Sequence, residues 1–525
     1  MKNKTFLLPV LMAAFLAVGM LLGNKLSPGQ PKVLAGGQSK YEKLQDIIQI
    51  LDKRYVDEID SEELFEKSIG DMLHKLDPHS NYIPARDLKA INEELEGKFG
   101  GVGIRFFIIR DTVCVTNVLA GSPSMKAGLK AGDKILTVDG KKVAKKKITN
   151  DQIMDLLKGR EGTAVKLGLY RDGKTIHKKV IRGSIPVESV TAAYMIDKEI
   201  GFIKIERFSL ETAREFRFAS FNLKQKGMKK LVIDLRNNGG GILTGATDIA
   251  DEFLSDNKSI VYTEGANTKR YDFVCKRPGL FETGKITVLI DESSASASEV
   301  LAGALQDWDR ATIIGRRSFG KGLVQQQFGL TDGSAVRLTI ARYFTPLGRN
   351  IQKNYAVGKE KYEQELEDRF HSGLLDKTDS SLLKGKKFKT PAGRILYGGG
   401  GITPDVIVPL TASLQDTLIM QLYLSNTLSD FVYTLYKNNR SYFDGFKTPE
   451  ALAKGFIPDA AEWNAFVAAA AKDNILANKV SASGKAYLLQ TIKVLMARQM
   501  FRTEGYYQIL NTTDSLIAKA LQQLK

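Results

Sequence analysis

The sequence predicts an α/β multidomain protein with helical regions at both ends. The chain has 525 residues, which is several times the size of a small domain, and 43% of them are apolar, enough for true cores. Between residues 200 and 350, short apolar runs alternate with helical patterns, which indicates an α/β core with mixed strand pairing. Residues 40–97 and 413–525 follow a helical period instead.

The chain is strongly basic, with a net charge of +17. Such a charge suits either a nucleic-acid or an anionic-membrane partner. The basic residues are scattered, however, apart from "GKKVAKKKIT" at 140–149, and no nucleic-acid-binding motif is present. A solvated surface is therefore the favoured interpretation, and no nucleic-acid partner is expected.

The N-terminus has the pattern of an export signal. Lys2 and Lys4 precede an uncharged apolar run at residues 6–22, and Lys25 follows it. The run lies at the short limit for a membrane helix. Residues 1–26 are therefore expected to be a signal peptide or an uncleaved signal anchor in the inner membrane. Both alternatives export the rest of the chain, so we expect a periplasmic protein.

A Pro/Gly-rich linker at residues 27–39 leads into the helical region at 40–97. In "YEKLQDIIQILDKRY" the apolar residues recur with a period near 3.6. The stretch "LDPHSNYIP" at 76–84 interrupts this pattern with turn residues. His74 and His79 fall here, and because no cysteine or acidic pattern surrounds them, a structural role is favoured over metal ligation.

Residues 98–183 resemble a PDZ domain. The likeness lies in "GGVGIRF" and in "GSPSMKAGLKAGDKILTVDG", which occur in the order that a PDZ domain has. A glycine-rich turn before a strand exposes successive backbone N–H groups, which can hold a terminal carboxylate while the peptide adds as a strand to the sheet edge. A glycine-rich hairpin without a ligand is the alternative. The expected peptide-binding residues are Gly100, Gly101, Val102, Gly103 and Ile104.

Residues 184–412 are expected to hold the α/β core. "LVIDLRNNGGG" is a buried strand running into a glycine loop, and "KITVLIDESSASASEVLAGALQDW" repeats the order of strand and then helix. Residues 353–390 are charged and irregular, which is typical of an insertion, and "GGGGITPDVIVPL" returns to the core. Residues 413–525 are expected to form a C-terminal helical domain.

Cysteine and histidine are too few for the common metal sites. The chain has only Cys114 and Cys275 and no CxxC pair, which excludes a disulfide framework and disfavours a thiolate metal site. The four histidines form no HExxH pair, which excludes a zinc hydrolase of that type. We expect neither a metal nor a cofactor. A serine nucleophile would also find few histidines to act as its base.

A candidate nucleophile lies in "DESSASASEV" at 291–300. An apolar strand enters this stretch and a helix leaves it, so Ser296 lies where unpaired backbone N–H groups and the positive end of the helix dipole collect. Such a position stabilises an oxyanion. The natural donors are the N–H of Ala297 and one from the glycines 239–241. The alternative, favoured by this stretch alone, is that Ser296 only caps the helix.

A candidate base follows 25 positions after Ser296. The stretch "RSFGKGLVQQQF" places Lys321 between two glycines, which let the lysine stem enter a tight apolar site. Desolvation there lowers the pKa of an amine, so that a neutral amine can take the serine proton. If the strand has begun by Lys321, Gln325 shares a face with it and can orient the amine.

These motifs together resemble those of the C-terminal processing peptidases, also called tail-specific proteases. The likeness runs from about Tyr41 to Pro409 and includes "LDPHSNYI", the PDZ block, "DLRNNGGG", "SASASEVLAGALQD", "GRRSFGKGLVQ", "ARYFTPLGRNIQ" and "GGGITPD". The resemblance implies a ClpP/crotonase-like α/β protease core with an inserted PDZ domain. It also implies that Ser296 is the nucleophile, Lys321 the base and Gln325 its support.

The oxyanion loop departs from the family pattern. This chain has "NNGGG" where "NNPGG" is commoner, and the family's oxyanion glycine falls on Gly239 or Gly240. The resemblance therefore assigns Ala297 and one of these two glycines to the oxyanion hole.

The expected function is an exported serine endopeptidase that recognises substrate C-termini through its PDZ domain and processes or degrades envelope proteins with a Ser–Lys dyad. The alternatives are a catalytically silent peptide- or ligand-binding protein on the same fold and a crotonase-like acyl-CoA enzyme. The complete set of Ser296, Lys321 and Gln325 disfavours the first, and the PDZ block and export signal disfavour the second. Expected partners are proteins or peptides with free C-termini. The sequence leaves open an adaptor protein, a homo-oligomer and association with the inner membrane.

Overall fold

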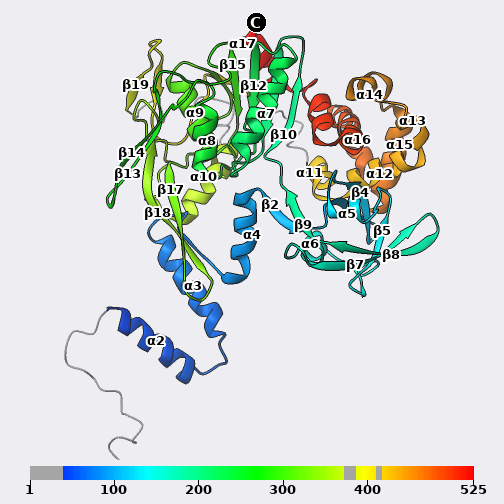
Figure 1. Cartoon of the computed structure of the whole chain (residues 1–525), viewed down its shortest axis with the longest axis horizontal. Helices are drawn as coiled ribbons and strands as arrows, with labels where there is room; N and C mark the ends of the chain where they lie inside the picture. Colours follow the sequence, from blue (N-terminus) through cyan, green and yellow to red (C-terminus); the bar gives the residue numbers. More distant parts are fainter. Residues whose placement is uncertain (1–39, 372–385, 410–416) are drawn as a thin grey trace, which may run out of the picture. The chain divides into compact units, whose positions relative to one another are not determined.

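The computed structural model describes residues 40–371, 386–409 and 417–525 (Figure 1). The export signal and the linker expected at 1–26 and 27–39 lie outside these residues. Within the described residues, no helix combines the length and the apolar character that crossing a membrane requires.

The described residues divide into two compact units, one that ends at Met72 and one that begins at Leu73. The helical pattern expected in the N-terminal region is present, and β1 interrupts it. Gly97 ends the last of these helices at φ 72°, a left-handed position that glycine occupies without strain. The elements are α2 (Lys40–Arg54), α3 (Ser61–His74), β1 (Asn81–Ile83) and α4 (Ala85–Glu96).

The PDZ-like module contains a sheet with the strand order β3-β4-β5-β7-β8, so β3 is an edge strand. Ile153 and Leu157 of α6 lie in the same buried cluster as Val165, Leu167 and Leu169 of β7. A separate ribbon of β2 and β9 leads into and out of the module. The elements are β2 (Lys98–Gly101), β3 (Ile104–Ile109), β4 (Thr112–Val118), α5 (Pro123–Lys126), β5 (Lys134–Val138), β6 (Lys141–Lys142), α6 (Asn150–Leu157), β7 (Ala164–Arg171), β8 (Lys174–Ile181) and β9 (Gly183–Pro186).

The α/β core contains a six-stranded sheet with the order β10-β11-β12-β15-β16-β21. The strands from β11 to β21 are parallel, and β10 joins β11 antiparallel, so the pairing is mixed as predicted. The strands are β10 (Val190–Met195), β11 (Ile200–Ile205), β12 (Lys230–Asp234), β15 (Ile286–Ile290), β16 (Thr312–Gly315) and β21 (Val406–Ile407).

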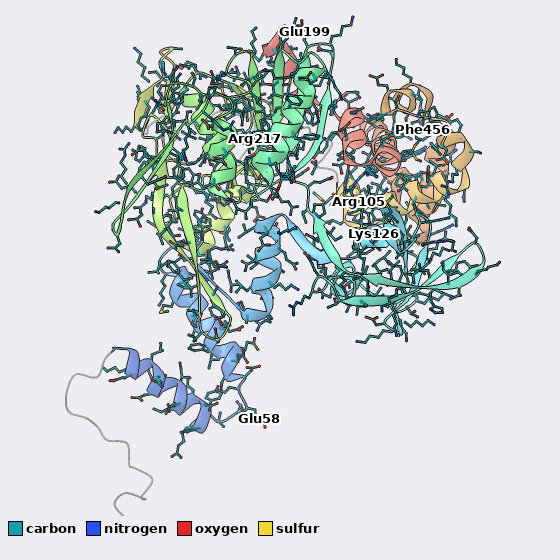
Figure 2. All side chains as sticks on the ribbon, viewed as in Figure 1. Glu58, Arg105, Lys126, Glu199, Arg217 and Phe456 are labelled. Carbon is teal, nitrogen blue, oxygen red and sulfur yellow. The ribbon has the colours of Figure 1, made fainter. Side chains whose placement is uncertain are left out.

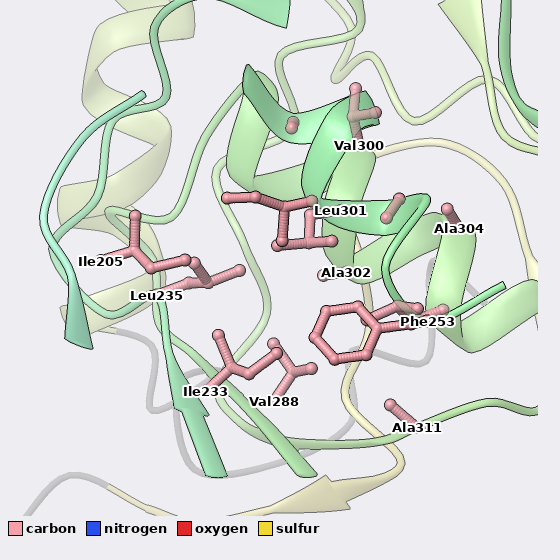
Figure 3. Close-up of a cluster of buried hydrophobic side chains, with 14 of the residues drawn as sticks. Ile205, Ile233, Leu235, Phe253, Val288, Val300, Leu301, Ala302, Ala304 and Ala311 are labelled. Carbon is pink, nitrogen blue, oxygen red and sulfur yellow. The ribbon is translucent and has the colours of Figure 1, made fainter. Parts of the chain in front are cut away.

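Helices cover both faces of this sheet. α7 (Thr212–Gln225), α8 (Leu243–Ala250) and α9 (Ala297–Asp307) contribute to the large buried cluster on one face, where Leu301 of α9 lies near Ile233 and Val288 of the sheet (Figure 3). α17 (Ser515–Leu524) covers the other face, where Leu516 joins a cluster with Leu289. The C-terminal segment is therefore part of the core and not only an appended region.

A second sheet has the order β1-β18-β13-β14, and β17 pairs with β18. Its strands from the core are β13 (Ser259–Gly265), β14 (Thr268–Val274), β17 (Leu323–Gly329) and β18 (Ala335–Phe344). The segment expected to be irregular at 353–390 was predicted wrongly in part, because residues 359–371 form the helix α10 (Lys359–His371). β19 (Lys387–Lys389) and β20 (Ile395–Tyr397) make a short hairpin after it.

The remaining C-terminal residues are helical, as predicted. Phe466 of α15 and Leu488 of α16 lie at the centre of their own buried cluster, which includes Phe456, labelled in Figure 2. The elements are α11 (Thr417–Leu424), α12 (Thr427–Asn438), α13 (Arg440–Phe443), α14 (Pro449–Gly455), α15 (Ala460–Lys472), a 3₁₀ turn (Ala477–Lys479) and α16 (Ala482–Leu510).

Candidate active site

The topology of the core sheet brings two functional loops together. β12 and β15 are parallel neighbours, with Asp234 opposite Leu289, so both strands end at the same edge of the sheet. The glycine loop follows β12 and the serine loop follows β15. The carboxyl ends of parallel strands are where α/β proteins commonly place their sites.

Ser296 lies at a sharp turn between β15 and α9. Its backbone has φ 55° and ψ −116°, a combination that costs free energy for a residue other than glycine. In the first turn of α9, the Glu299 N–H donates to the Ser296 carbonyl oxygen at 2.8 Å, and the Glu299 side chain accepts the Ser296 N–H, as in a capping box. Ser296 also lines a cavity of about 790 Å³.

The glycine loop lies against this turn. A Cβ atom at Gly240 would be 2.8 Å from Ser296 Cβ and 2.6 Å from the Ala295 carbonyl oxygen, so only glycine fits there. The Gly240 N–H donates to Asn238 Oδ1 at 2.9 Å. Among the described residues, the N–H groups of Ala297 and Gly239 have no acceptor. Two backbone donors are therefore free beside Ser296.

Lys321 and Gln325 line the same cavity as Ser296. Lys321 Nζ donates to Gln325 Oε1 at 2.8 Å, and Gln325 Nε2 donates to the backbone carbonyl of His79 at 2.6 Å. Burial lowers the pKa of Lys321, and the positive charge of Arg337 lowers it further. In the described part of the chain, no hydrogen bond joins Lys321 Nζ to Ser296 Oγ.

Glu299 holds the backbones of Ser296 and Lys321 together, a contact that the sequence analysis missed. One carboxylate oxygen accepts the N–H of Ser296 at 2.9 Å and the N–H of Lys321 at 2.8 Å. The other oxygen accepts from Ser318 Oγ at 2.5 Å and from the Gly320 N–H at 2.8 Å. Burial raises the pKa of Glu299 to about 7, and these hydrogen bonds oppose the rise. The signal available in the sequence was the Ser-x-x-Glu spacing at the start of the helix.

Tyr343 joins the same two backbones from their carbonyl side. Its hydroxyl lies within hydrogen-bonding distance of the Ser296 carbonyl oxygen, at 3.1 Å, and of the Lys321 carbonyl oxygen. The side chain is 2% exposed. Glu299 and Tyr343 therefore fix the separation of the two segments that carry Ser296 and Lys321.

The start of the glycine loop is held by a buried ion-pair network. Arg236 forms bidentate contacts with Asp234 and a second ion pair with Asp514, at 2.7 Å, from the residue that precedes α17. The Asp291 carboxylate accepts the N–H of Asn237 at 3.0 Å. These contacts tie the glycine loop to the serine loop and to the C-terminal segment.

α10 contacts His79, whose backbone carbonyl accepts the hydrogen bond of Gln325. His79 Nε2 lies 2.7 Å from the hydroxyl of Tyr362, which is 3% exposed. Burial lowers the pKa of His79 to about 4, and the nearby charge of Lys321 contributes, so the ring is neutral at neutral pH. Glu365 of α10 accepts hydrogen bonds from Arg317 and Lys353. α10 thus packs on the segment that leads to Lys321.

The expected peptide-binding residues lie in the PDZ-like module and not in the cavity. Gly100 and Gly101 pair with β9, and Val102 is 3% exposed. Gly103 has φ 77°, and Ile104 begins the edge strand β3. The free edge of β3 is available for an added strand.

Four family models match the chain. Residues 199–359 match peptidase family S41, and residues 100–181 match the PDZ domain. Residues 24–86 match the N-terminal domain of the activating protease CtpB, and residues 418–502 match a family of unknown function.

Curated relatives share much of this length. A carboxy-terminal-processing protease of Bartonella bacilliformis is 36% identical over 365 residues, which are 67% of this chain and 82% of the relative. A probable CtpA-like serine protease of Staphylococcus aureus strain COL is 33% identical over 333 residues, which are 62% of this chain and 66% of the relative.

Among solved structures, the photosystem II D1 C-terminal processing protease matches with 27% identity and a TM-score of 0.37, over 71% of this chain and 87% of that chain. The matches to the family models and to the relative from Bartonella together cover the PDZ-like module and the core that carries the cavity. The chain belongs to the carboxy-terminal-processing proteases of peptidase family S41.

Proposed function

We propose that the protein is an exported serine endopeptidase in which Ser296 and Lys321 form a catalytic dyad. The observation that supports this most strongly is that Ser296, Lys321 and Gln325 line one cavity, with two free backbone donors beside the serine. The lowered pKa of Lys321 favours the neutral amine that a base must have. A binding protein without turnover would have no need of this combination.

In the first step, the neutral Lys321 amine takes the proton of the Ser296 hydroxyl as Oγ attacks the substrate carbonyl carbon. A change of side-chain rotamer brings Nζ from Gln325 towards Oγ. The carbonyl oxygen becomes an oxyanion, held by backbone N–H groups. When this intermediate collapses, the C–N bond breaks and the Lys321 ammonium returns its proton to the leaving amine, leaving an acyl-enzyme on Ser296.

Deacylation repeats the same proton transfers with water. The neutral Lys321 amine takes a proton from water as the water oxygen attacks the acyl carbon. The new intermediate collapses, Ser296 leaves and regains its proton from Lys321, and the new C-terminus of the product is released. Between these proton transfers, Gln325 holds the amine in the cavity by accepting its hydrogen bond.

The oxyanion donors are the N–H of Ala297 and the N–H of Gly239. Both lie beside Ser296 without an intramolecular acceptor among the described residues. The N–H of Gly240 is already donated to Asn238 Oδ1, so it can serve only after that side chain turns away. Gly239, the first glycine of the "NNGGG" stretch, thus supplies an N–H that a proline at this position would lack.

The PDZ-like module is proposed to bind the substrate's C-terminus. The turn at residues 102–103, between β2 and β3, would receive the terminal carboxylate, and the peptide would extend the sheet along β3. The N-terminal export pattern supports recognition in the periplasm, with envelope proteins as the proposed substrates.

Cleavage is expected to depend on the free carboxylate of the substrate. A peptide with an apolar C-terminal residue should be cleaved at least about tenfold more efficiently, in kcat/KM, than the same peptide with a C-terminal amide, because the amide lacks the charge that backbone N–H groups hold. Mass spectrometry of matched free-acid and amidated peptides measures this. Equal cleavage of the two would contradict the proposed tail recognition, and absence of any cleavage would favour the binding protein.

A further inference from the structure

The PDZ-like module carries most of the net charge of the chain. Residues 98–183 contain 19 lysines and arginines against 7 aspartates and glutamates, whereas the rest of the chain contains 57 against 52. The module therefore holds 12 of the 17 excess positive charges, which corrects the interpretation that the basic residues are scattered. A concentrated charge of this kind points to an anionic partner.

One face of the module's sheet presents this charge. Along β7, Val165, Leu167 and Leu169 are buried in the core that α6 covers. Because side chains alternate along a strand, Lys166 and Tyr170 point to the opposite, exposed face.

The neighbouring strand β8 continues the same face. Lys179 pairs directly with Lys166, and His177 and Ile181 lie at alternate positions on either side of it. All three side chains of β8 are exposed, whereas Val180 is buried in the core.

β5 and β6 add two further lysines. Lys134 pairs with Tyr170, and its Nζ lies 5.9 Å from the centre of the Tyr170 ring. Lys142 pairs with Thr137, which in turn pairs with Gly168 of β7. We call the resulting surface the basic face, and its members are Lys134, Lys142, Lys166, Tyr170, His177, Lys179 and Ile181.

The positive charge of the basic face is not neutralised from within the protein. In the part of the chain that the structure describes, none of its four lysines forms an ion pair. Lys166 and Lys179 are a like-charged pair directly across two antiparallel strands, which destabilises a sheet. The acidic residue beside them, Asp139, accepts the backbone N–H of Lys166 at 2.8 Å. The fold therefore retains an unfavourable arrangement that an external anion would relieve.

Two apolar side chains among the lysines indicate what kind of anion fits. Tyr170 is 40% exposed and Ile181 is 49% exposed. A surface that mixes lysines with an exposed tyrosine and an aliphatic side chain matches the interface of a membrane, where the ring lies at headgroup level and the ammonium groups meet lipid phosphates. We propose that the basic face binds an anionic phospholipid surface.

The basic face and the expected peptide site occupy different parts of the module. The basic face is part of the side of the sheet opposite α6, where Cys114 of β4 contacts Tyr433 of α12, whereas the peptide would add along the edge of β3. Lipid binding would therefore leave the peptide site open, and it does not depend on the proposed dyad. Arg105 and Lys126, labelled in Figure 2, are cations of the same module outside the basic face.

Lysine footprinting of the full chain tests the proposal at residue level. The protein is treated with an amine-acylating reagent, and peptide mass spectrometry measures how far Lys166 and Lys179 are acylated. The comparison is between vesicles of phosphatidylglycerol and phosphatidylcholine and vesicles of phosphatidylcholine alone. We expect acylation of both lysines to fall at least fivefold with the anionic vesicles only, and to recover in high salt. Lys454, Lys472 and Lys479, which are exposed in the C-terminal helices, should keep their reactivity. This readout is insensitive to any lipid contact made by the N-terminal residues.

A charge-matched pair of variants tests the same face by affinity. The triple variant Lys142→Gln, Lys166→Gln and Lys179→Gln should bind anionic vesicles at least tenfold more weakly than wild type. The control Lys454→Gln, Lys472→Gln and Lys479→Gln removes equal charge and should bind as wild type does.

Both triple variants should cleave a soluble peptide at the wild-type rate, which confirms that they are folded. Three outcomes would overturn the proposal. The first is that anionic vesicles leave the acylation of Lys166 and Lys179 unchanged, and the second is that both triple variants lose equal affinity for anionic vesicles. The third is that duplex DNA, but not vesicles, protects the two lysines from acylation. The first two outcomes would exclude the basic face as a lipid site, and the third would assign it to nucleic acid.

Discussion

Replacement of Lys321 by alanine or by arginine is expected to leave a folded protein whose kcat is about 10³-fold below that of wild type or lower. Alanine removes the proton acceptor. Arginine keeps the positive charge and much of the length, but a guanidinium does not lose its proton in proteins, so it rescues nothing. Peptide cleavage at saturating substrate, with circular dichroism as the check on folding, measures this effect.

Gln325→Ala is the matched control for the loss of the base. It removes the hydrogen bond that orients the amine but keeps the amine itself, so we expect a smaller loss, of about tenfold to a hundredfold. Near-normal turnover of Lys321→Arg would contradict the assignment of Lys321 as base.

The same assignment predicts how activity depends on pH. Only the neutral amine can accept a proton, so kcat should rise with pH. The rise should reach its plateau at a lower pH than a free lysine would give, because the pKa of a free lysine side chain is about 10.4. The direction follows because burial and the charge of Arg337 lower the pKa of Lys321. Single replacement of any of the four histidines should leave this ionisation in place, since the His79 contact to Gln325 comes from its backbone. A histidine that proved indispensable without affecting the fold would contradict the mechanism.

Glu299→Gln is expected to lower kcat by about 10²-fold, a loss of the size that a misplaced catalytic group causes. The carboxylate accepts four hydrogen bonds, from Ser296, Ser318, Gly320 and Lys321. An amide of the same shape has one oxygen, so one pair of donors would face an NH₂ group and lose its acceptor. The backbones of Ser296 and Lys321 would then separate, and KM should change much less than kcat.

Glu252→Gln separates this positioning effect from the general cost of losing a buried carboxylate. Glu252 and Glu299 are each 1% exposed, but Glu252 contacts Arg277 and the Leu280 N–H, away from the cavity. Both variants should lower the melting temperature, and only Glu299→Gln should lower kcat well below that temperature. Equal kcat values for the two variants would show that Glu299 serves stability alone.

Local patterns in the sequence are sufficient to predict the elements that position the site. The run "LVIDL" before a glycine loop and the run "ITVLI" before a serine-rich turn each predict a buried strand followed by a helix, and both are present as β12 and β15. Parallel pairing then places the two loops at one edge. Lys321 and Gln325 could be named because their spacing and their glycine neighbours are themselves local features.

The contacts that hold these residues in place could not be predicted in the same way. Tyr362 meets His79 across 283 positions of the chain, and Asp514 meets Arg236 across 278. Such contacts are set by how helices pack on the core, and no period or spacing encodes them. The segment around Tyr362 is rich in charge and was therefore taken as irregular, although Tyr362 itself is buried by the tertiary fold.

Labelling by a fluorophosphonate tests the central claim, that Ser296 is a nucleophile activated by Lys321. The reagent forms a bond between phosphorus and an activated serine oxygen with loss of fluoride, and mass spectrometry locates the adduct. We predict a single adduct, on Ser296, which is absent in Ser296→Ala and strongly reduced in Lys321→Arg. Equal labelling of Ser296→Ala, or an adduct on Ser294 or Ser298 in place of Ser296, would contradict the account.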